Sequence, residues 1–314
     1  MKVLVTDGLD PAALAALRKA HEVDVQELDA KALLAAIPAY HGIIVRSRTK
    51  VTKDVLSRAT QLKVIGRSGV GVDNIDVEEA TARKIVVVNA PAASTVSVAE
   101  LAIGHIVSLL RHLPEADLSV RSGKWEKARF EGRELFGKTL GLLGSGRIGA
   151  EVAKRAQAFG MKVIAHDPYL SPKIAEGLGI RLVERDPLFR DADVLSIHAA
   201  LTSETRGLVG APQLAKMRRT AILVNCARGE IVDEAALADA LRAGTIAGAA
   251  IDVYAKEPPI GSPLLTAPNA VFTPHLGAST AEAQTRAGAI VVEQVVQVLA
   301  GRRPEFVVNP KVYD

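Results

Sequence analysis

The most constraining feature of this sequence is a glycine pattern between an apolar run and a helical stretch. Gly144, Gly146 and Gly149 fit G-x-G-x-x-G, with the apolar run 139–144 before them and a helical pattern over 152–159. Such glycines allow a tight turn and a close approach of the backbone to a pyrophosphate, while the helix start supplies N–H donors and a positive dipole end. A glycine-rich turn without a ligand would need neither the strand nor the helix, so the pattern predicts a dinucleotide-binding βαβ unit.

The residue that follows the next strand indicates which dinucleotide binds. Strand 162–166 leads to Asp167, which stands 18 residues after Gly149. An acid at this place accepts hydrogen bonds from the adenosine ribose and repels a 2′-phosphate. No arginine stands beside Asp167 to reverse that preference. We therefore predict NAD rather than NADP as the cofactor; the plainer role for Asp167 is that of a turn residue before Pro168.

Composition limits the class of protein and its partners. With 314 residues and 48% hydrophobic content the chain suits two globular domains and not a disordered protein. No run of about 18 uncharged apolar residues is present, so no membrane span is expected, and the strand-like start predicts a cytoplasmic protein. The net charge of +4 is spread along a chain with 4% aromatic residues, which favours a small anionic ligand or ordinary surface charge over nucleic acid. A single cysteine, Cys226, and the histidine spacing predict no metal site.

The order of predicted elements indicates an α/β fold with a division. Short β-branched runs alternate with alanine-rich helical stretches, which is typical of parallel sheets covered by helices. The first series ends near residues 90–97, where Ser94 can cap a long apolar helix, and a second series begins at Lys138. Because this helix is apolar over more than one face, we expect it and the segment to Gly137 to form a homodimer interface. His105 and His112 are expected on the same helix, in packing or at the interface.

Polar residues follow three later strands of the second series. Arg228, Glu257 and His275 each lie just after a predicted strand, and the carboxyl ends of parallel strands surround the ligand in such folds. An arginine grips a carboxylate with a planar fork, and a histidine oriented by a carboxylate can exchange a proton near neutral pH. The three residues therefore predict hydride transfer to or from a 2-hydroxy acid. Taken singly, each of them could be an ordinary turn or surface residue.

Motifs along almost the whole chain carry a resemblance to a known family. They lie at 67–76, 140–149, 225–229, 231–234 and 274–280. With them the sequence resembles the D-isomer-specific 2-hydroxyacid dehydrogenases, most closely the members that oxidise D-3-phosphoglycerate to 3-phosphohydroxypyruvate in serine biosynthesis. The resemblance implies two Rossmann-like domains with parallel sheets, the nucleotide domain being inserted into a flavodoxin-like substrate domain. Residues 1–94 and 282–314 would form the substrate-binding domain, and residues 95–281 the NAD-binding domain.

The resemblance also implies a set of site residues. Arg228, Glu257 and His275 would be catalytic. Residues at the glycine turn and at the strand ends would contact the cofactor, namely Gly144, Gly146, Arg147, Ile148, Gly149, Asp167, Ala199, Cys226, Ala227, Asp252, Gly277 and Ala278. Residues of the first domain would bind substrate, with the two arginines at its phosphate end: Arg46, Arg67, Val70 and Gly71.

Three functions stay open at this point. The first is oxidation of D-3-phosphoglycerate, the second is reduction of glyoxylate or hydroxypyruvate, and the third is NAD(H) sensing by a corepressor-like binding protein. Retention of the arginine, glutamate and histidine argues against the third, because sensing does not require them. The chain departs from the family at Ala200, where proline is usual, and at Glu230, where glycine is frequent. It ends at Asp314 without the regulatory domains of many relatives, so no serine feedback through such domains is expected.

Overall fold

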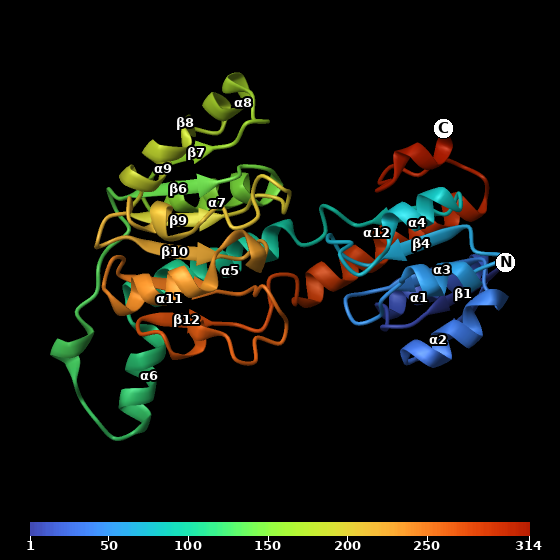
Figure 1. The fold of residues 1–314 in the computed structure, drawn as a ribbon, viewed down its shortest axis with the longest axis horizontal. Helices are drawn as coiled ribbons and strands as arrows, with labels where there is room; N and C mark the ends of the chain where they lie inside the picture. Colours follow the sequence, from blue (N-terminus) through green and yellow to red (C-terminus); the bar gives the residue numbers. More distant parts are fainter. The chain divides into compact units, whose positions relative to one another are not determined.

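The computed structural model describes residues 1–314, which divide into two compact units (Figure 1). One unit comprises Met1–Thr95 and Ala278–Asp314, and the other comprises Val96–Gly277. The chain therefore leaves the first unit once and returns to it. The sequence predicts these transitions at 94/95 and 281/282; the substrate-binding role of the first unit remains a prediction.

The first unit is built on a five-stranded parallel sheet. Its strands are β1 (Lys2–Val5), β2 (Glu22–Val25), β3 (Gly42–Val45), β4 (Val64–Arg67) and β5 (Val86–Asn89). They follow the order β2-β1-β3-β4-β5, which is the flavodoxin order. Its helices are α1 (Pro11–Ala20), α2 (Ala30–Ala36), α3 (Lys53–Arg58), α4 (Val77–Ala82) and α12 (Ala281–Leu299), with short 3-10 turns η1 (Ile37–Ala39) and η5 (Pro310–Tyr313). Side chains of α2, α3 and α4 pack on one face of the sheet, and those of α1 and α12 pack on the other.

The second unit is built on a seven-stranded parallel sheet. Its strands are β6 (Thr139–Leu143), β7 (Lys162–His166), β8 (Arg181–Leu182), β9 (Val194–Ile197), β10 (Ile222–Asn225), β11 (Gly248–Ile251) and β12 (Ala270–Phe272). Their order is β12-β11-β10-β9-β6-β7-β8. Successive strands are therefore added on one side of β6 up to β8 and on its other side from β9 onward, as in a Rossmann sheet.

Helices cover both faces of this second sheet. They are α5 (Thr95–Leu110), α6 (Leu113–Arg121), α7 (Arg147–Ala158), α8 (Pro172–Gly177), α9 (Arg185–Asp191), α10 (Ala211–Leu214) and α11 (Glu234–Arg242), with 3-10 turns η2 (Lys127–Phe130), η3 (Gly229–Ile231) and η4 (Pro263–Thr266). Side chains of α5, α7 and α8 pack on one face, and those of α9, α10 and α11 pack on the other. Figure 1 shows α6 and the segment after it extending away from the sheet of this unit.

Local sequence accounts for where these elements begin. The strands that lie inside the sheets are apolar on both faces, as β3 and β10 show by being buried at every position. Asp10 accepts hydrogen bonds from two backbone N–H groups of α1, and Asp233 does the same at α11. Such caps satisfy donors that the helix itself leaves unpaired. The predicted fold class, two Rossmann-like units with parallel sheets, is confirmed.

One expectation for the first long helix is wrong, and the homodimer interface expected on this helix stays a prediction. His112 does not lie on it, because α5 ends at Leu110 and His112 takes a left-handed conformation (φ 53°) before α6. The apolar residues of α5 are mostly used inside their own unit, since Ile103, Ile106 and Leu110 are buried in its core. Apart from Val96, the exposed large apolar side chains of this region follow in α6 and beyond. No single helix has both the length and the apolar character to cross a membrane; only α5 and α6 taken together pass that test, and they are bent by 62°.

Candidate active site

The glycine turn between β6 and α7 is shaped to receive a phosphate. Gly144 has φ +86°, and a Cβ there would lie 2.6 Å from the backbone nitrogen of Ala199. A Cβ on Gly149 would lie 2.7 Å from the carbonyl oxygen of Gly144, so only glycine lets the helix pack against the turn. Gly146 and Arg147 are exposed, and no side chain caps the first N–H groups of this 12-residue helix. An uncapped, accessible helix start of this kind fits the pyrophosphate of a dinucleotide.

Asp167 lies at the rim of the same turn. Its Oδ2 accepts a hydrogen bond from the Ser145 N–H at 2.7 Å, and its Oδ1 accepts one from the Tyr169 N–H at 2.9 Å. These two bonds hold the carboxylate at the end of β7, beside the glycine turn. The position suits a ligand for the ribose next to the pyrophosphate. The pairing of Asp167 with Ser145 was not foreseen from the sequence, because it depends on β6 and β7 being neighbours.

Asn225 organises the turn that carries Arg228. Its amide nitrogen donates to the Arg228 carbonyl oxygen at 2.9 Å, and its carbonyl oxygen accepts from the Ala227 N–H at 3.1 Å. Asn225 is 1% exposed, so the turn after β10 is held from inside the protein. The Arg228 guanidinium donates to the Ala227 carbonyl oxygen at 2.7 Å. Asn225 begins the motif 225–229, but no role was assigned to it from the sequence, although an asparagine two residues before a turn amide is a recognisable signal.

Cys226 lies in the same turn and is buried. Burial and the charge of Asp252 raise the pKa of its thiol, which disfavours the reactive thiolate. Cys226 can therefore line the site through its backbone without taking part in redox chemistry.

Glu257 and His275 form a close pair after β11 and β12. The His275 Nδ1 lies 3.0 Å from Oε1 and 2.8 Å from Oε2 of Glu257, in side chains that are 49% and 41% exposed respectively. The hydrogen bond with Glu257 raises the pKa of His275 against the opposing effect of burial, and the Asp252 carboxylate acts in the same direction. Burial opposes ionisation of Glu257, but His275, the Tyr254 N–H and Arg228 together outweigh it and hold the pKa of this carboxyl below its usual range. Nδ1 is thus engaged by Glu257, and Nε2 is the nitrogen left for chemistry.

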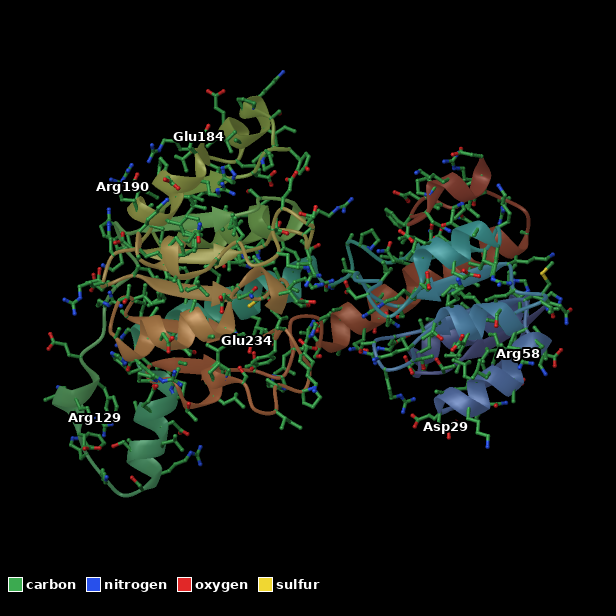
Figure 2. The ribbon with its side chains drawn as sticks, viewed as in Figure 1. Asp29, Arg58, Arg129, Glu184, Arg190 and Glu234 are labelled. Atoms are coloured by element: carbon green, nitrogen blue, oxygen red, sulfur yellow. The ribbon has the colours of Figure 1, made fainter.

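The loop that carries Glu257 is tied to α11. Glu234, at the start of that helix (Figure 2), accepts hydrogen bonds from the Ala255 N–H at 2.8 Å and from the Ser262 hydroxyl at 2.5 Å. The Tyr254 N–H donates to Oε1 of Glu257 at 3.2 Å. Glu234 and Tyr254 therefore support the histidine–glutamate pair. Glu234 ends the motif 231–234 without a role assigned to it from the sequence, and Tyr254 was not singled out.

The four predicted substrate residues all lie in the first unit. Arg46 follows β3 and Arg67 ends β4, which is its neighbour in the sheet, so both leave the carboxyl edge of that sheet. Asp7 accepts the Arg46 N–H at 2.7 Å, and Asn74 donates to the Arg46 carbonyl oxygen at 2.8 Å. The Val70 carbonyl oxygen accepts from the Asn89 amide at 2.7 Å, and Gly71 follows it. The backbone of the Arg46 turn is therefore held by Asp7 and Asn74, for which the sequence indicated no such role.

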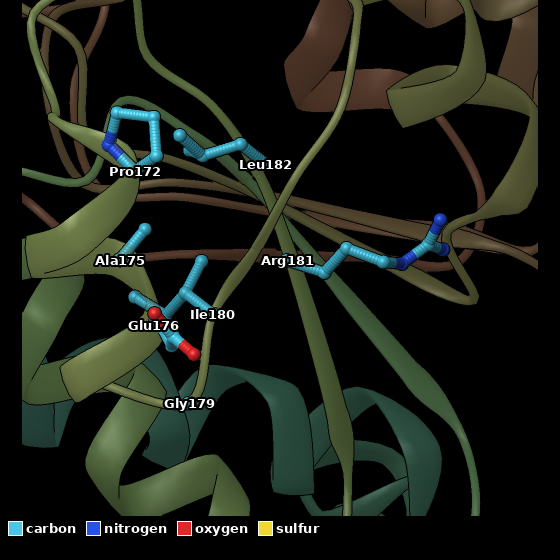
Figure 3. A pocket seen from close by; sticks show the side chains of 7 residues that line it. All are labelled: Pro172, Ala175, Glu176, Gly179, Ile180, Arg181 and Leu182. Atoms are coloured by element: carbon cyan, nitrogen blue, oxygen red, sulfur yellow. The ribbon is translucent and has the colours of Figure 1, made fainter.

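A surface pocket elsewhere in the second unit takes no part in this arrangement. Figure 3 shows it between α8 and β8, lined by Pro172, Ala175, Glu176, Gly179, Ile180, Arg181 and Leu182. None of the predicted site residues lines this pocket. The candidate active site is defined by the carboxyl ends of the strands and not by this surface hollow.

Comparison with known proteins places the chain in a family. Residues 103–277 match the family described as D-isomer specific 2-hydroxyacid dehydrogenase, NAD binding domain. The chain belongs to this family, which confirms the predicted resemblance and NAD as the cofactor. Small hydroxy and keto acids are the substrates of this family. The residues of the chain that contact cofactor and substrate remain predictions.

The chain is also similar in sequence and structure to individual known proteins. D-3-phosphoglycerate dehydrogenase of Methanocaldococcus jannaschii is 51% identical over 311 residues, which make up 98% of this chain and 59% of the relative. Among solved structures, the TT0316 protein of Thermus thermophilus is 40% identical with a TM-score of 0.91, covering 98% of this chain and 100% of that one. A glyoxylate reductase from Paecilomyes thermophila is 31% identical with a TM-score of 0.89, covering 98% of each chain. The chain thus spans about three fifths of the curated relative's length.

Proposed function

We propose that this chain catalyses the NAD-dependent oxidation of D-3-phosphoglycerate to 3-phosphohydroxypyruvate, a step of serine biosynthesis. The observation that carries the proposal is the His275–Glu257 pair, with both carboxylate oxygens within 3.0 Å of Nδ1 and with Arg228 close enough to affect both pKa values. Similarity to a D-3-phosphoglycerate dehydrogenase at 51% identity supports the choice of substrate.

In the proposed mechanism Arg228 binds the substrate carboxylate and orients the carbon that carries the hydroxyl group. The glycine turn and Asp167 would hold NAD, which would supply the acceptor for the hydride of that carbon. His275 takes the hydroxyl proton on Nε2 and becomes an imidazolium, whose charge Glu257 stabilises through Nδ1. In the reverse direction the imidazolium returns this proton to the keto oxygen. Arg46 and Arg67 would bind the phosphate group, since two guanidinium groups can share its charge.

The proposed binding of the substrate phosphate by Arg46 and Arg67 distinguishes oxidation of D-3-phosphoglycerate from reduction of glyoxylate or hydroxypyruvate. Glyoxylate and hydroxypyruvate carry no phosphate, so a reductase for them would not require Arg46 or Arg67. The likeness to a glyoxylate reductase at 31% identity keeps this second candidate open. NAD(H) sensing without turnover is disfavoured because it needs neither His275 nor Glu257.

Turnover tests the proposal directly. Formation of NADH with D-3-phosphoglycerate is measured beside consumption of NADH with glyoxylate and with hydroxypyruvate. We expect the phosphorylated substrate to have the highest kcat/KM, and His275→Ala to lose roughly 10²–10⁴ in kcat while still binding NADH. A higher kcat/KM for glyoxylate would replace the first function by the second, and no turnover of any substrate would favour the sensing function.

The proposal includes a homodimer that uses the segment after α5. Exposed apolar side chains gather there, with Leu118 66%, Trp125 85% and Phe136 78% exposed. The segment also carries charged residues: Arg129, on η2 between Trp125 and Phe136, is exposed (Figure 2). Large exposed apolar groups on one projecting segment mark an interaction surface. Sedimentation as a monomer at micromolar concentration would refute this part. A cytoplasmic location stays a prediction from the sequence.

A further inference from the structure

A buried histidine lies behind the turn that carries His275. His105, on α5, is 4% exposed, and its Nε2 lies 3.1 Å from the hydroxyl oxygen of Thr273. Thr273 follows β12 and donates its hydroxyl proton to Oδ1 of Asp252 at 2.5 Å. Asp252 follows the neighbouring strand β11 and is fully buried. A continuous chain of hydrogen bonds therefore runs from a helix on one face of the sheet to the candidate active site.

The donor of each hydrogen bond between His105, Thr273 and Asp252 can be assigned from the chemistry of the groups. A carboxylate only accepts hydrogen bonds, so the single proton of the Thr273 hydroxyl points to Asp252. The oxygen of Thr273 must then accept from His105, which requires the proton of the imidazole to be on Nε2. Burial lowers the pKa of His105, against a smaller opposing effect of Asp252, so the ring is neutral at neutral pH. His105 is thereby a neutral donor whose direction is set.

Asp252, at one end of this series of hydrogen bonds, holds the backbone around His275. Its Oδ1 accepts the Leu276 N–H at 2.7 Å, its Oδ2 accepts the Gly277 N–H at 2.9 Å, and its carbonyl oxygen accepts the His275 N–H at 2.8 Å. His275 itself has φ +54°, in the left-handed region that residues other than glycine seldom adopt. Such a conformation persists only where the surroundings determine it, and here Asp252 provides three bonds to consecutive residues.

We propose that His105 is a positioning residue for the acid/base group: by holding Thr273, it keeps Asp252 in the orientation that fixes the left-handed turn at His275. The inference rests on the proposed acid/base role of His275. A leucine at position 105 would fill similar space on the apolar α5 but would leave the Thr273 oxygen without its donor. Asp252 would then be held by one neighbour fewer, and the turn could relax toward an ordinary backbone conformation.

Because His105 is neutral, its removal deletes no charge near the site. The charged groups that act on His275 are Glu257, Asp252 and Arg228, and all three stay in the variant. A change in the pKa of His275 would therefore report a change in its position relative to Glu257. A purely space-filling role of His105 would not produce such a change.

The test compares His105→Leu with His105→Gln, whose terminal amide nitrogen can take the place of Nε2 as donor. The pKa of His275 is measured by NMR titration of the chain without substrate, its signal among the seven histidines being assigned by its loss in His275→Ala. In His105→Leu we expect this pKa to fall and kcat to drop about 10-fold with the KM for NADH unchanged, less than the ~10² that full misplacement of a reacting group costs. His105→Gln should restore both. Ile106→Val, a fully buried change on the same helix, should alter neither.

Two results would overturn the inference. One is a folded His105→Leu protein with the wild-type His275 pKa and a kcat within twofold of wild type. The other is a folded His105→Gln protein that is as impaired as His105→Leu, since the donor would then be irrelevant. The NMR readout needs no substrate, so failure of the proposed oxidation of D-3-phosphoglycerate is distinguished from failure of the positioning role.

Discussion

Replacement of Glu257 by glutamine isolates the charge in the His275–Glu257 pair. The amide keeps the shape of the side chain and one oxygen that can accept from Nδ1, which in the native protein lies 3.0 and 2.8 Å from the two carboxylate oxygens. The hydrogen bond with Glu257 is the largest cause of the raised pKa of His275. The pKa of His275 should therefore be lower in Glu257→Gln.

The size of the effect follows from the bond and its exposure. A hydrogen bond to a charged group is worth about 1.5–3 kcal/mol and a neutral one about 0.5–1.5 kcal/mol, a difference of about 1–1.5 kcal/mol. The two side chains are 49% and 41% exposed, so screening by water reduces this difference to about 0.5–1 kcal/mol. At ~1.4 kcal/mol for each factor of ten, the imidazolium population falls about 2- to 5-fold at pH values above the pKa.

The two directions of the reaction should respond with opposite signs. Reduction of the keto acid needs the imidazolium, so its rate declines as pH rises through the pKa of His275, and in the variant this decline starts at lower pH. Oxidation of the hydroxy acid needs the neutral ring, so its rise with pH also starts at lower pH. On the sloping parts of the profiles, the population effect makes reduction about 2- to 5-fold slower and oxidation faster by a similar factor.

Profiles of kcat/KM against pH in both directions, followed by NADH absorbance, measure this shift for the free enzyme. Glu176→Gln, an exposed change on α8, is the matched control and should leave both profiles in place. The reasoning is refuted by unshifted profiles in Glu257→Gln, or by a shift of either profile to higher pH.

Three further predictions use other parts of the chain. Arg46→Ala or Arg67→Ala should raise the KM for D-3-phosphoglycerate roughly 10- to 100-fold, the cost of one charge-assisted bond, and leave the KM for glyoxylate nearly unchanged; equal losses would indicate a general structural role. Asp167→Ser should strengthen NADP binding relative to NAD in fluorescence titrations, and wild-type protein that binds NADPH as tightly as NADH would contradict the assignment. Burial lowers the pKa of His198 to about 4 from the ordinary 6.5, so unfolding takes up a proton in this window and stability falls as pH drops from 6.5 to 4. In His198→Gln, the decrease in the free energy of unfolding between pH 6.5 and 4, measured by urea unfolding, should be smaller by up to about 3 kcal/mol. The same decrease in the variant as in wild type would refute this role of His198.

Much of the second unit is predictable because its signals are local. The turn at Gly144 and Gly149 requires glycine at particular positions, and the strands around it are short apolar runs that no other element suits as well. Asp167 follows from the same unit, since a βαβ segment places the acid at the end of its second strand. The alternation of strands and helices also predicts parallel sheets without knowledge of any long-range contact.

The individual contacts of the candidate site were not predictable in this way. The contact of His275 with Glu257 was expected only through the chemistry of these residues and the family resemblance, and the contact of Thr273 with Asp252 was not expected. Both contacts form because β11 and β12 are neighbours in the sheet, and strand order is set by packing of the whole unit. The same holds for His105, whose helix lies far from Thr273 in sequence. No local pattern distinguishes a core histidine from one that supports a reacting group.

The sequence by itself determined the fold class, the dinucleotide turn and the residue types available for proton and carboxylate chemistry, because each depends on backbone conformation or side-chain chemistry over a few residues. Tertiary structure alone decided that most apolar residues of α5 pack inside its own unit, while most of the exposed ones in this region follow in α6 and the segment after it. It also decided which buried donors hold the left-handed turn at His275. The physical reason is that burial and hydrogen-bond partners are properties of the assembled sheet, where residues distant in the chain compete for the same few acceptors.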